Sequence, residues 1–221
     1  MNNLAHDHLV QAYTRKSHEF ELFMNWVADF ISNHPDLNQP GNEIIHSSKR
    51  RLKDKEHLRE KLSRKAISGD NIDIENFFNK ITDFSGVRII HLFQEQFSHI
   101  DAIIRSRIES EDWVLHERPK AYTWDPESAA YFRKFDLNVE EKPTSYTSVH
   151  YVVRPRQKSP ISCEIQVRTL FEEIWGEVDH KINYPHPTES ITCREQIKVL
   201  SKLVGAGSRL LDSIQRAHEN R

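Results

Sequence analysis

The sequence predicts an α+β fold in which a mixed central β-sheet is packed by helices, with a helical extension at each end of the chain. Short β-branched segments fill the middle of the chain, and both ends repeat apolar residues at helical spacing. Eleven Phe, four Trp and six Tyr among 221 residues supply enough bulk for a hydrophobic core. We expect an N-terminal extension at 1–40, a sheet domain at 41–186 and a C-terminal extension at 187–221.

The elements follow from apolar spacing and from residues that end helices. Residues 4–34 are predicted to form one long helix, which Asn33-His34-Pro35 ends. Residues 36–48 are predicted to form a loop with at most a short strand, and Asp54 is expected to cap a helix that runs to Ile67. The remaining predictions are a short helix at 74–81, a buried strand at 86–93, a helix at 94–109, a brief strand at 113–116, a polar stretch at 117–126, a helix at 127–135, strands at 146–154 and 161–168, and helices at 169–182 and 190–218.

Composition limits the classes of partner. The chain carries 31 Lys and Arg against 33 Asp and Glu, a net charge of −2, so it has no general attraction for DNA or for anionic lipid. Cys163 and Cys193 lack metal-ligand spacing, which indicates reduced thiols. The sequence has no secretory signal and no apolar run that would span a bilayer. We expect a cytoplasmic protein that binds neither membrane nor DNA.

A local basic cluster interrupts this balance. Residues 49–65 hold nine Lys and Arg against three Asp and Glu. On the helix that Asp54 caps, His57, Lys61 and Arg64 form one stripe, and other cations alternate on extended backbone just before it. Cations that converge at a helix start suit a polyphosphate. A solvated basic helix face is the alternative, and this cluster alone does not exclude it.

Two acidic residues lie at or near predicted strands. Asp83 precedes the strand at 86–93, and Glu164 shares one face of the strand at 161–168 with Gln166 and Arg168. Two carboxylates together with substrate phosphates are the usual protein site for Mg²⁺. The alternatives are a turn-forming Asp and a solvated Glu, which neither motif excludes by itself.

An aromatic and polar motif begins at Lys142 and continues along the next strand. Tyr146, Ser148 and His150 alternate onto one strand face. Tyr is able to stack on a nucleobase, and His150 and Lys142 are able to contact phosphates. Ordinary cross-strand packing explains the same residues equally well.

Taken in order, these motifs resemble the synthetase domain of the RelA/SpoT family, which makes the alarmone (p)ppGpp. The resemblance runs from Ser47 to Tyr184 and covers most of the chain. It implies a nucleotidyltransferase-like α+β fold. The motifs that carry it are Arg51-Leu52-Lys53 with Lys61 and Arg64, DFSGVRII, SYTSVHYVV and EIQVRTLFEEIWGEVDHKINY.

The resemblance also implies a role for each matching residue. Asp83 and Glu164 would bind Mg²⁺, and Glu164 would also help to deprotonate the acceptor hydroxyl. On the ATP side, Arg51 and Arg88 would sandwich the adenine while Lys53, Lys61 and Arg64 hold the phosphates. On the acceptor side, Tyr146 would stack on guanine, Lys142 and His150 would lie near its phosphates, and Gln166 and Arg168 would form the floor.

The implied activity is that of a GTP pyrophosphokinase, which transfers pyrophosphate from Mg·ATP to the ribose 3′-hydroxyl of GDP or GTP. One alternative keeps the chemistry but uses an adenine nucleotide or the tRNA 3′-end as acceptor. A second alternative is an inactive interaction module, which the presence of the expected site residues disfavours. The tRNA alternative would need a basic surface beyond the ATP site, for which the candidates are Lys49, Arg50, Arg154, Arg156 and Lys158.

Two features stay open at the level of sequence. The segment at 118–141 is longer and more aromatic than the link typical of small synthetases, and its Tyr122, Trp124 and Tyr131 form a lid or simply pack. The apolar faces of the two terminal helices cover the sheet or form contacts in a homo-oligomer.

Overall fold

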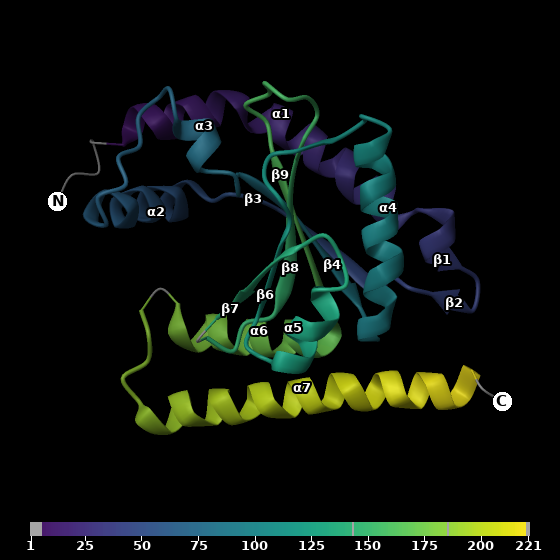
Figure 1. Ribbon diagram of the computed structural model, residues 1–221. Helices are drawn as coiled ribbons and strands as arrows, with labels where there is room; N and C mark the ends of the chain where they lie inside the picture. Colours follow the sequence, from purple (N-terminus) through teal and green to yellow (C-terminus); the bar gives the residue numbers. More distant parts are fainter. Residues whose placement is uncertain (1–5, 143, 185, 220–221) are drawn as a thin grey trace.

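One mixed β-sheet organises the chain in the computed structural model, which describes residues 6–142, 144–184 and 186–219 (Figure 1). Six strands follow one another in the order β3-β4-β9-β8-β6-β7, and β5 pairs with β8 outside this path. The strands are β3 (Ser47–Leu52), β4 (Ser85–His91), β5 (Val114–Leu115), β6 (Lys120–Thr123), β7 (Asn138–Glu141), β8 (Ser148–Arg154) and β9 (Cys163–Thr169).

Parallel and antiparallel pairs coexist in this sheet. β4 and β9 are parallel, as are β6 and β7, while the other neighbours run antiparallel. The register places Gly86 of β4 opposite Glu164 of β9. The structure therefore confirms the predicted α+β fold with a mixed sheet packed by helices.

Helices cover one face of the sheet. α1 (Asp7–Ser32) and α4 (Phe97–Glu109) share one hydrophobic core with the alternate, inward-facing residues of the central strands. Phe20 and Ile31 of α1 are completely buried there, as is Ile100 of α4. The division of the chain at residues 40 and 186 stays a prediction, and α1 belongs to the same core as the sheet.

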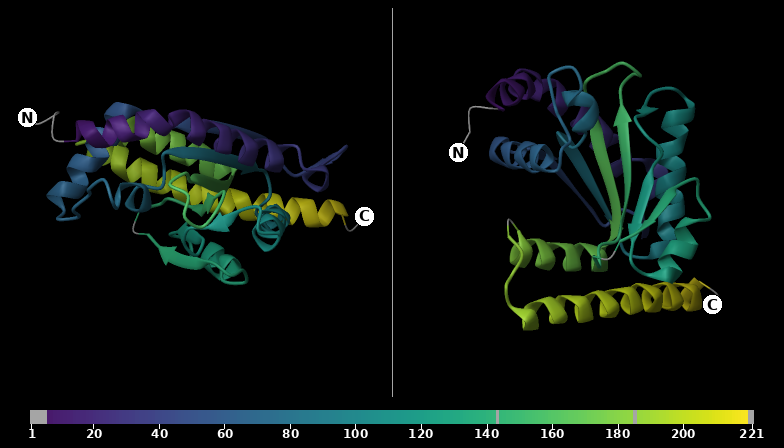
Figure 2. Two further views of the ribbon diagram at one scale, coloured as in Figure 1. Left: turned by 90° about the horizontal axis from the view of Figure 1, so that it is seen from above. Right: turned by 60° about the vertical axis from the view of Figure 1, so that its left-hand side comes forward.

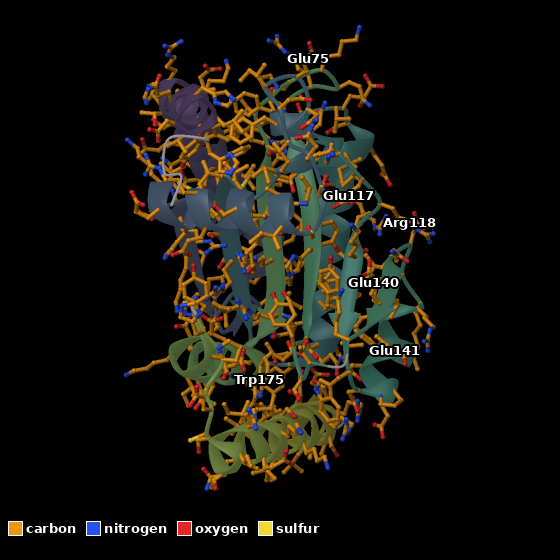
Figure 3. The ribbon with its side chains drawn as sticks, turned by 90° about the vertical axis from the view of Figure 1, so that its left-hand side faces the viewer. Glu75, Glu117, Arg118, Glu140, Glu141 and Trp175 are labelled. Carbon is orange, nitrogen blue, oxygen red and sulfur yellow. The ribbon has the colours of Figure 1, made fainter. Side chains whose placement is uncertain are left out.

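The other face of the sheet is uncovered between α2 (Lys55–Ile67) at one end of the strands and the pair α6 (Leu170–Asn183) and α7 (Ile191–Glu219) at the other (Figures 1 and 3). α7 runs alongside α6 on the side away from the sheet (Figure 2). The indole Nε1 of Trp175 in α6 donates to the carbonyl of Ile197 at 3.1 Å, which fixes the two helices together.

Short elements connect these layers. The chain turns through two 3₁₀ segments, Pro35–Leu37 and Gln94–Gln96, and through a hairpin whose Gly41 has a φ of +80°. The other short elements are β1 (Asn38–Gln39), β2 (Asn42–Glu43), α3 (Phe77–Lys80) and α5 (Pro126–Phe132).

Several predicted elements are confirmed with close boundaries. The Oδ1 atom of Asp54 accepts from the backbone N–H groups of Glu56 and His57 at 2.9 and 3.1 Å, so α2 begins where its cap predicts. The predicted N-terminal helix is α1, although residues 4 and 5 lie outside the described residues. None of the helices in the described part of the chain combines the length and the apolar composition needed to cross a bilayer.

The segment at 117–141 differs from its prediction. The polar stretch at 117–126 contains β6, and the segment after α5 contains β7. The expected helix at 127–135 begins earlier, because Asp125 caps the backbone N–H of Ser128 at 3.1 Å, and it ends at Phe132. Both strands are four residues long and pair with strands of the sheet rather than with a local hairpin partner.

Candidate active site

A cleft of about 430 Å³ opens on the uncovered face of the sheet, against α6. Strand alternation turns Glu164, Gln166 and Arg168 of β9 to this face, while Cys163, Ile165 and Val167 enter the core. Five residues that the sequence predicts for the site line the cleft: Arg51, Arg88, Tyr146, Gln166 and Arg168.

Asp83 lies just before β4 and joins two lysines of the basic cluster. Lys53 Nζ and Lys61 Nζ each donate to one of its carboxylate oxygens at 2.8 Å. Burial raises the pKa of Asp83, but the charges of Lys61 and Lys53 outweigh burial and lower the pKa to about 2. The carboxylate is therefore ionised at neutral pH and holds both ammonium groups at one point.

Glu164 is the second carboxylate of the open face and is held by two polar neighbours. Its Oε1 lies 3.1 Å from His150 Nδ1, and its Oε2 accepts from Gln166 Nε2 at 2.6 Å. Burial raises the pKa of Glu164, but the hydrogen bond and charge of His150 and the hydrogen bond from Gln166 together outweigh burial, so the net shift is downward. Glu164 is therefore also ionised at neutral pH.

The two carboxylates converge, although 81 positions separate them in the sequence. Glu164 lies directly across from Gly86, three residues beyond Asp83, in the parallel pair β4–β9. Burial and, to a smaller extent, the negative charge of Asp83 oppose the lowering of the Glu164 pKa, as expected of neighbouring carboxylates. Both belong to the same end of the open face.

Arg51 and Arg88 lie on adjacent strands at one edge of the cleft. Together with Lys49 and Gly86 they line a hollow of about 160 Å³. A Cβ atom at Gly86 would lie 3.8 Å from Arg51 Nε, an ordinary contact distance, so the glycine leaves room beside the guanidinium without being required by the backbone. The structure brings this arginine pair together.

Arg64 is the one predicted ATP-side residue that lies apart from the others. It is exposed on α2 and lines a separate groove with Glu60 and Tyr184, whereas Lys61 of the same helix reaches Asp83. Tyr184 borders both this groove and the main cleft. Its hydroxyl donates to Glu60 at 2.8 Å, which ties the end of α6 to α2.

A buried acid that the sequence reading missed organises the arginines. Glu173 of α6 has a side chain only 7% exposed, and it accepts from Lys49 Nζ and Arg88 Nη1 at 2.8 Å each. Its other oxygen lies 3.1 Å from Arg168 Nε. The sequence feature that could have identified Glu173 is its position within EEIWGE, three residues before Gly176 and on the same helix face.

Tyr146 lines the other side of the cleft, and His150 lies beside it. The Tyr146 hydroxyl lies 2.9 Å from His150 Nε2, and the Arg168 guanidinium lies 5.7 Å from the Tyr146 ring centre. Because ionised Glu164 can only accept, His150 Nδ1 carries a proton and donates it to Glu164. A chain of hydrogen bonds therefore runs from Tyr146 through His150 to Glu164.

Tyr122 of β6 is a second aromatic residue at this side. Of the two tyrosines and the tryptophan in the 118–141 segment, it is the one that packs beside the Tyr146–His150 pair. Its ring meets His150 edge-on at 5.0 Å and lies 6.4 Å from the Tyr146 ring. Lys142 Nζ lies 4.6 Å from the Tyr122 ring centre and donates to Glu140 at 3.0 Å. Tyr131, by contrast, packs against Phe97 in the core.

The chain matches the family model described as "Region found in RelA / SpoT proteins" over residues 50–189. This match takes in both carboxylates, most of the basic cluster and the Tyr146 motif. The chain belongs to the RelA/SpoT family.

Curated and structural relatives agree with this membership. GTP pyrophosphokinase YwaC of Bacillus subtilis (strain 168) is 26% identical over 149 residues, which cover 65% of this chain and 60% of the length of that relative. The small alarmone synthetase 1 from Bacillus subtilis bound to its product pppGpp superposes with a TM-score of 0.72 at 18% identity, over 95% of this chain and 99% of that one. A GTP pyrophosphokinase family protein from Streptococcus pneumoniae gives a TM-score of 0.68 at 17% identity, over 99% and 97%. At such identities the structural matches establish the fold.

The acidic pair of this RelA/SpoT chain has the donor set that suits Mg²⁺ with substrate phosphates. Asp83 and Glu164 are both ionised, and the described residues contain no cluster of three or more acidic, histidine or cysteine ligands. Mg²⁺ commonly takes one or two carboxylates and completes its coordination with phosphate oxygens and water. The two carboxylates fit such a shared site.

Proposed function

We propose that this protein transfers pyrophosphate from ATP to the ribose 3′-hydroxyl of GDP or GTP, producing (p)ppGpp and AMP. The observation that carries the proposal is the convergence of Asp83 and Glu164 between two lysines on one side and the Tyr146–His150 pair on the other. The family membership and the names of the relatives support the same reaction.

On the donor side, the arginines and lysines position ATP. Arg51 and Arg88 present planar guanidinium groups that suit stacking on an adenine. Lys53 and Lys61, which hold Asp83 in this structure, neutralise charge on the phosphates. Arg64 reaches the phosphates from α2 if Tyr184 swings away from Glu60.

On the acceptor side, Tyr146 stacks on the guanine and orients the ribose. The 3′-oxygen attacks the β-phosphorus of ATP in line, its bond to phosphorus forms, and the bond to the α–β bridging oxygen breaks. The hydroxyl proton passes to Glu164, and AMP leaves with the bridging oxygen. His150, hydrogen-bonded to Glu164, keeps the carboxylate turned towards the acceptor.

Mg²⁺ is the cofactor that we infer for this site. Asp83 and Glu164 would hold it together with the ATP phosphates, and there it would neutralise charge on the transferred group. Lys53 and Lys61 compete with a cation for Asp83 in the resting site, so we expect ATP to draw the two lysines onto its phosphates as the metal enters. Excess EDTA is therefore expected to stop transfer.

The tRNA alternative finds little support because most of its candidate cations already have partners. Lys49 pairs with Glu173, and Arg50 pairs with Asp29. Arg154 is 6% exposed and donates to Asn79 at 3.0 Å. A nucleotide acceptor needs no such surface.

The acceptor is tested by incubating the purified protein with Mg²⁺ and γ-labelled ATP against GDP, GTP, ADP and tRNA in parallel. Our proposal predicts labelled products with GDP and GTP, equimolar AMP, and loss of both in EDTA. Label on ADP or tRNA in preference to the guanine nucleotides would establish the other acceptor class. Absence of label on every acceptor would support the inactive module.

We further infer that the protein forms a homo-oligomer through its terminal helices and works in the cytoplasm. Apolar residues on α1 and α7 are exposed, among them Leu22 at 57%, Leu203 at 64% and Leu210 at 61%. The described cysteines are free thiols, which suits a reducing compartment where ATP and guanine nucleotides are available. Analytical ultracentrifugation tests the first inference, with a monomer as the contradicting result.

A further inference from the structure

The lysines at the acceptor end of the open face are each paired with a glutamate. Lys142 Nζ donates to Glu140 Oε2 at 3.0 Å, and Lys120 Nζ donates to Glu117 Oε2 at 2.5 Å. Both glutamates lie along the β6–β7 edge of the sheet (Figure 3). On the donor side, by contrast, Lys53 and Lys61 share a single carboxylate, that of Asp83.

Glu140 lies beside the aromatic residues of the acceptor side. It stands opposite Tyr122 in the β6–β7 pair, and Tyr122 meets His150 edge-on at 5.0 Å. The pKa of Lys120 is raised mainly by its hydrogen bond to Glu117 and that of Tyr122 mainly by burial, and the charge of Glu140 contributes a smaller upward shift to each. The Glu140 and Lys142 side chains are 34% and 40% exposed, which leaves both accessible to a bound phosphate.

The proposed reaction fixes the direction of the acceptor, and the inference rests on that proposal. The 3′-hydroxyl must face Glu164 on β9, while Tyr146 and His150 hold the base and ribose beside β8. The strand order β9-β8-β6-β7 then leaves the β6–β7 edge for the 5′-phosphates. These phosphates meet Lys142 and Lys120, whose charges are offset by Glu140 and Glu117.

We propose that Glu140 makes this site select a guanosine diphosphate over a guanosine triphosphate. The triphosphate brings one further phosphate with additional negative charge to an edge where the lysines are already balanced by glutamates. Like charges repel, and Glu140 is an accessible negative charge there. Glu140 acts on binding rather than on bond making, because Glu164 lies on β9 and Asp83 lies just before β4, both away from β7.

The test compares Glu140→Gln with the wild-type protein, using GDP and GTP as separate acceptors at saturating Mg·ATP. The substitution keeps the shape of the side chain and removes its charge. The ratio of kcat/KM for GTP to that for GDP is expected to rise about two- to sixfold, the effect of one unit charge at roughly 8 Å in an effective dielectric of 80 to 40. The change should lie in the KM for GTP, with kcat unchanged.

Glu141→Gln is the matched control. Glu141 is the next residue of β7 and is also ion-paired, to Arg133 at 2.7 Å, but it stands opposite Thr123, whose side chain is buried, rather than opposite Tyr122. Its substitution removes the same charge from the same strand and should leave the GTP:GDP ratio at the wild-type value. Glu140→Asp, which keeps the charge, should also retain the preference for GDP.

Two results are informative against the inference. An active Glu140→Gln protein whose GTP:GDP ratio matches the wild type, or an equal shift in the Glu141→Gln control, would overturn the role of Glu140 and leave the proposed reaction standing. A wild-type protein that transfers to neither nucleotide would instead overturn the proposed function itself. A melting curve for each variant verifies that the fold is retained.

Discussion

At the scale of single residues, Tyr146 allows a direct test of acceptor binding. Stacking of a base on an aromatic ring contributes about 1–3 kcal/mol, so Tyr146→Ala should raise the KM for the guanine acceptor by about 5- to 150-fold. The KM for ATP should stay near its wild-type value. Steady-state kinetics with each substrate varied in turn measures both constants.

Tyr146→Phe is the companion variant. It keeps the aromatic face and loses only the hydroxyl that contacts His150. If stacking is the main contribution, the Phe variant retains most of the acceptor affinity that the Ala variant loses. Equal losses in both variants would assign the role to the hydroxyl instead.

Glu172 gives a residue-level prediction of pH dependence. Burial raises its pKa from 4.5 to about 7, while its carboxylate accepts the backbone N–H of Thr169 at 2.7 Å. Glu172 therefore loses its proton at a lower pH in the unfolded chain than in the folded protein. As the pH rises from about 4.5 to about 7, this difference lowers the free energy of unfolding. Above pH 7 the cost is complete and constant.

Glu172→Gln removes this titration and still offers an oxygen to Thr169. The free energy of unfolding of the variant, relative to the wild type, should therefore rise between pH 4.5 and pH 7 and level off above that. Urea titrations at four or five pH values measure the difference. Parallel stability curves would contradict the raised pKa.

The convergence of Asp83 and Glu164 could be predicted, whereas the role of Glu173 could not. Alternation along β9 assigns Glu164 to the open face from sequence alone, and the family motif includes Asp83. Glu173 lies on a helix beside apolar residues, and only the packing of α6 on the sheet brings it to Arg88. Its burial depends on contacts far apart in the chain.

At the scale of elements, local signals explain which predictions are accurate. α2 has its predicted bounds. Asp54 caps its first turn, and Gly69, at a φ of +80°, follows its last turn. β6 and β7 carry no such signals. Their four-residue lengths and polar sequences gain stability only by pairing with β8 and with each other, which a single segment does not reveal.

The approach of α6 to β9 depends on Gly176. A Cβ atom there would lie 2.7 Å from Arg168 Nη1, so Gly176→Ala should displace the guanidinium from the floor of the cleft. The displaced group is the end of a flexible side chain, and alanine favours a helix by about 1 kcal/mol over glycine. We expect turnover to fall severalfold while the melting temperature changes little.

Gly205→Ala is the control for this substitution. Gly205 lies in α7, and an added Cβ would meet Arg209 and Trp124 at 3.7 Å, an ordinary contact distance. It gains the same helix propensity without moving Arg168. Equal turnover in the two variants would contradict the steric account of Gly176.

At the scale of the whole molecule, the strand order arranges the proposed reaction across the sheet. β3 and β4 carry the arginines of the donor side, β9 carries Glu164 at the centre, and β8, β6 and β7 carry the acceptor side. Helices close one face, so the substrates meet on the other. The chain needs only local basic charge for this, which agrees with its net charge of −2.

The central claim is that Asp83 and Glu164 form one metal-dependent catalytic centre. Glu164→Gln tests it most directly, since the amide keeps the size of the side chain and an acceptor for His150. We predict a fall in turnover of about 100- to 10,000-fold and weaker Mn²⁺ binding in the presence of an ATP analogue, measured by electron paramagnetic resonance, with an unchanged melting temperature. Near-normal turnover together with wild-type Mn²⁺ binding would contradict the account.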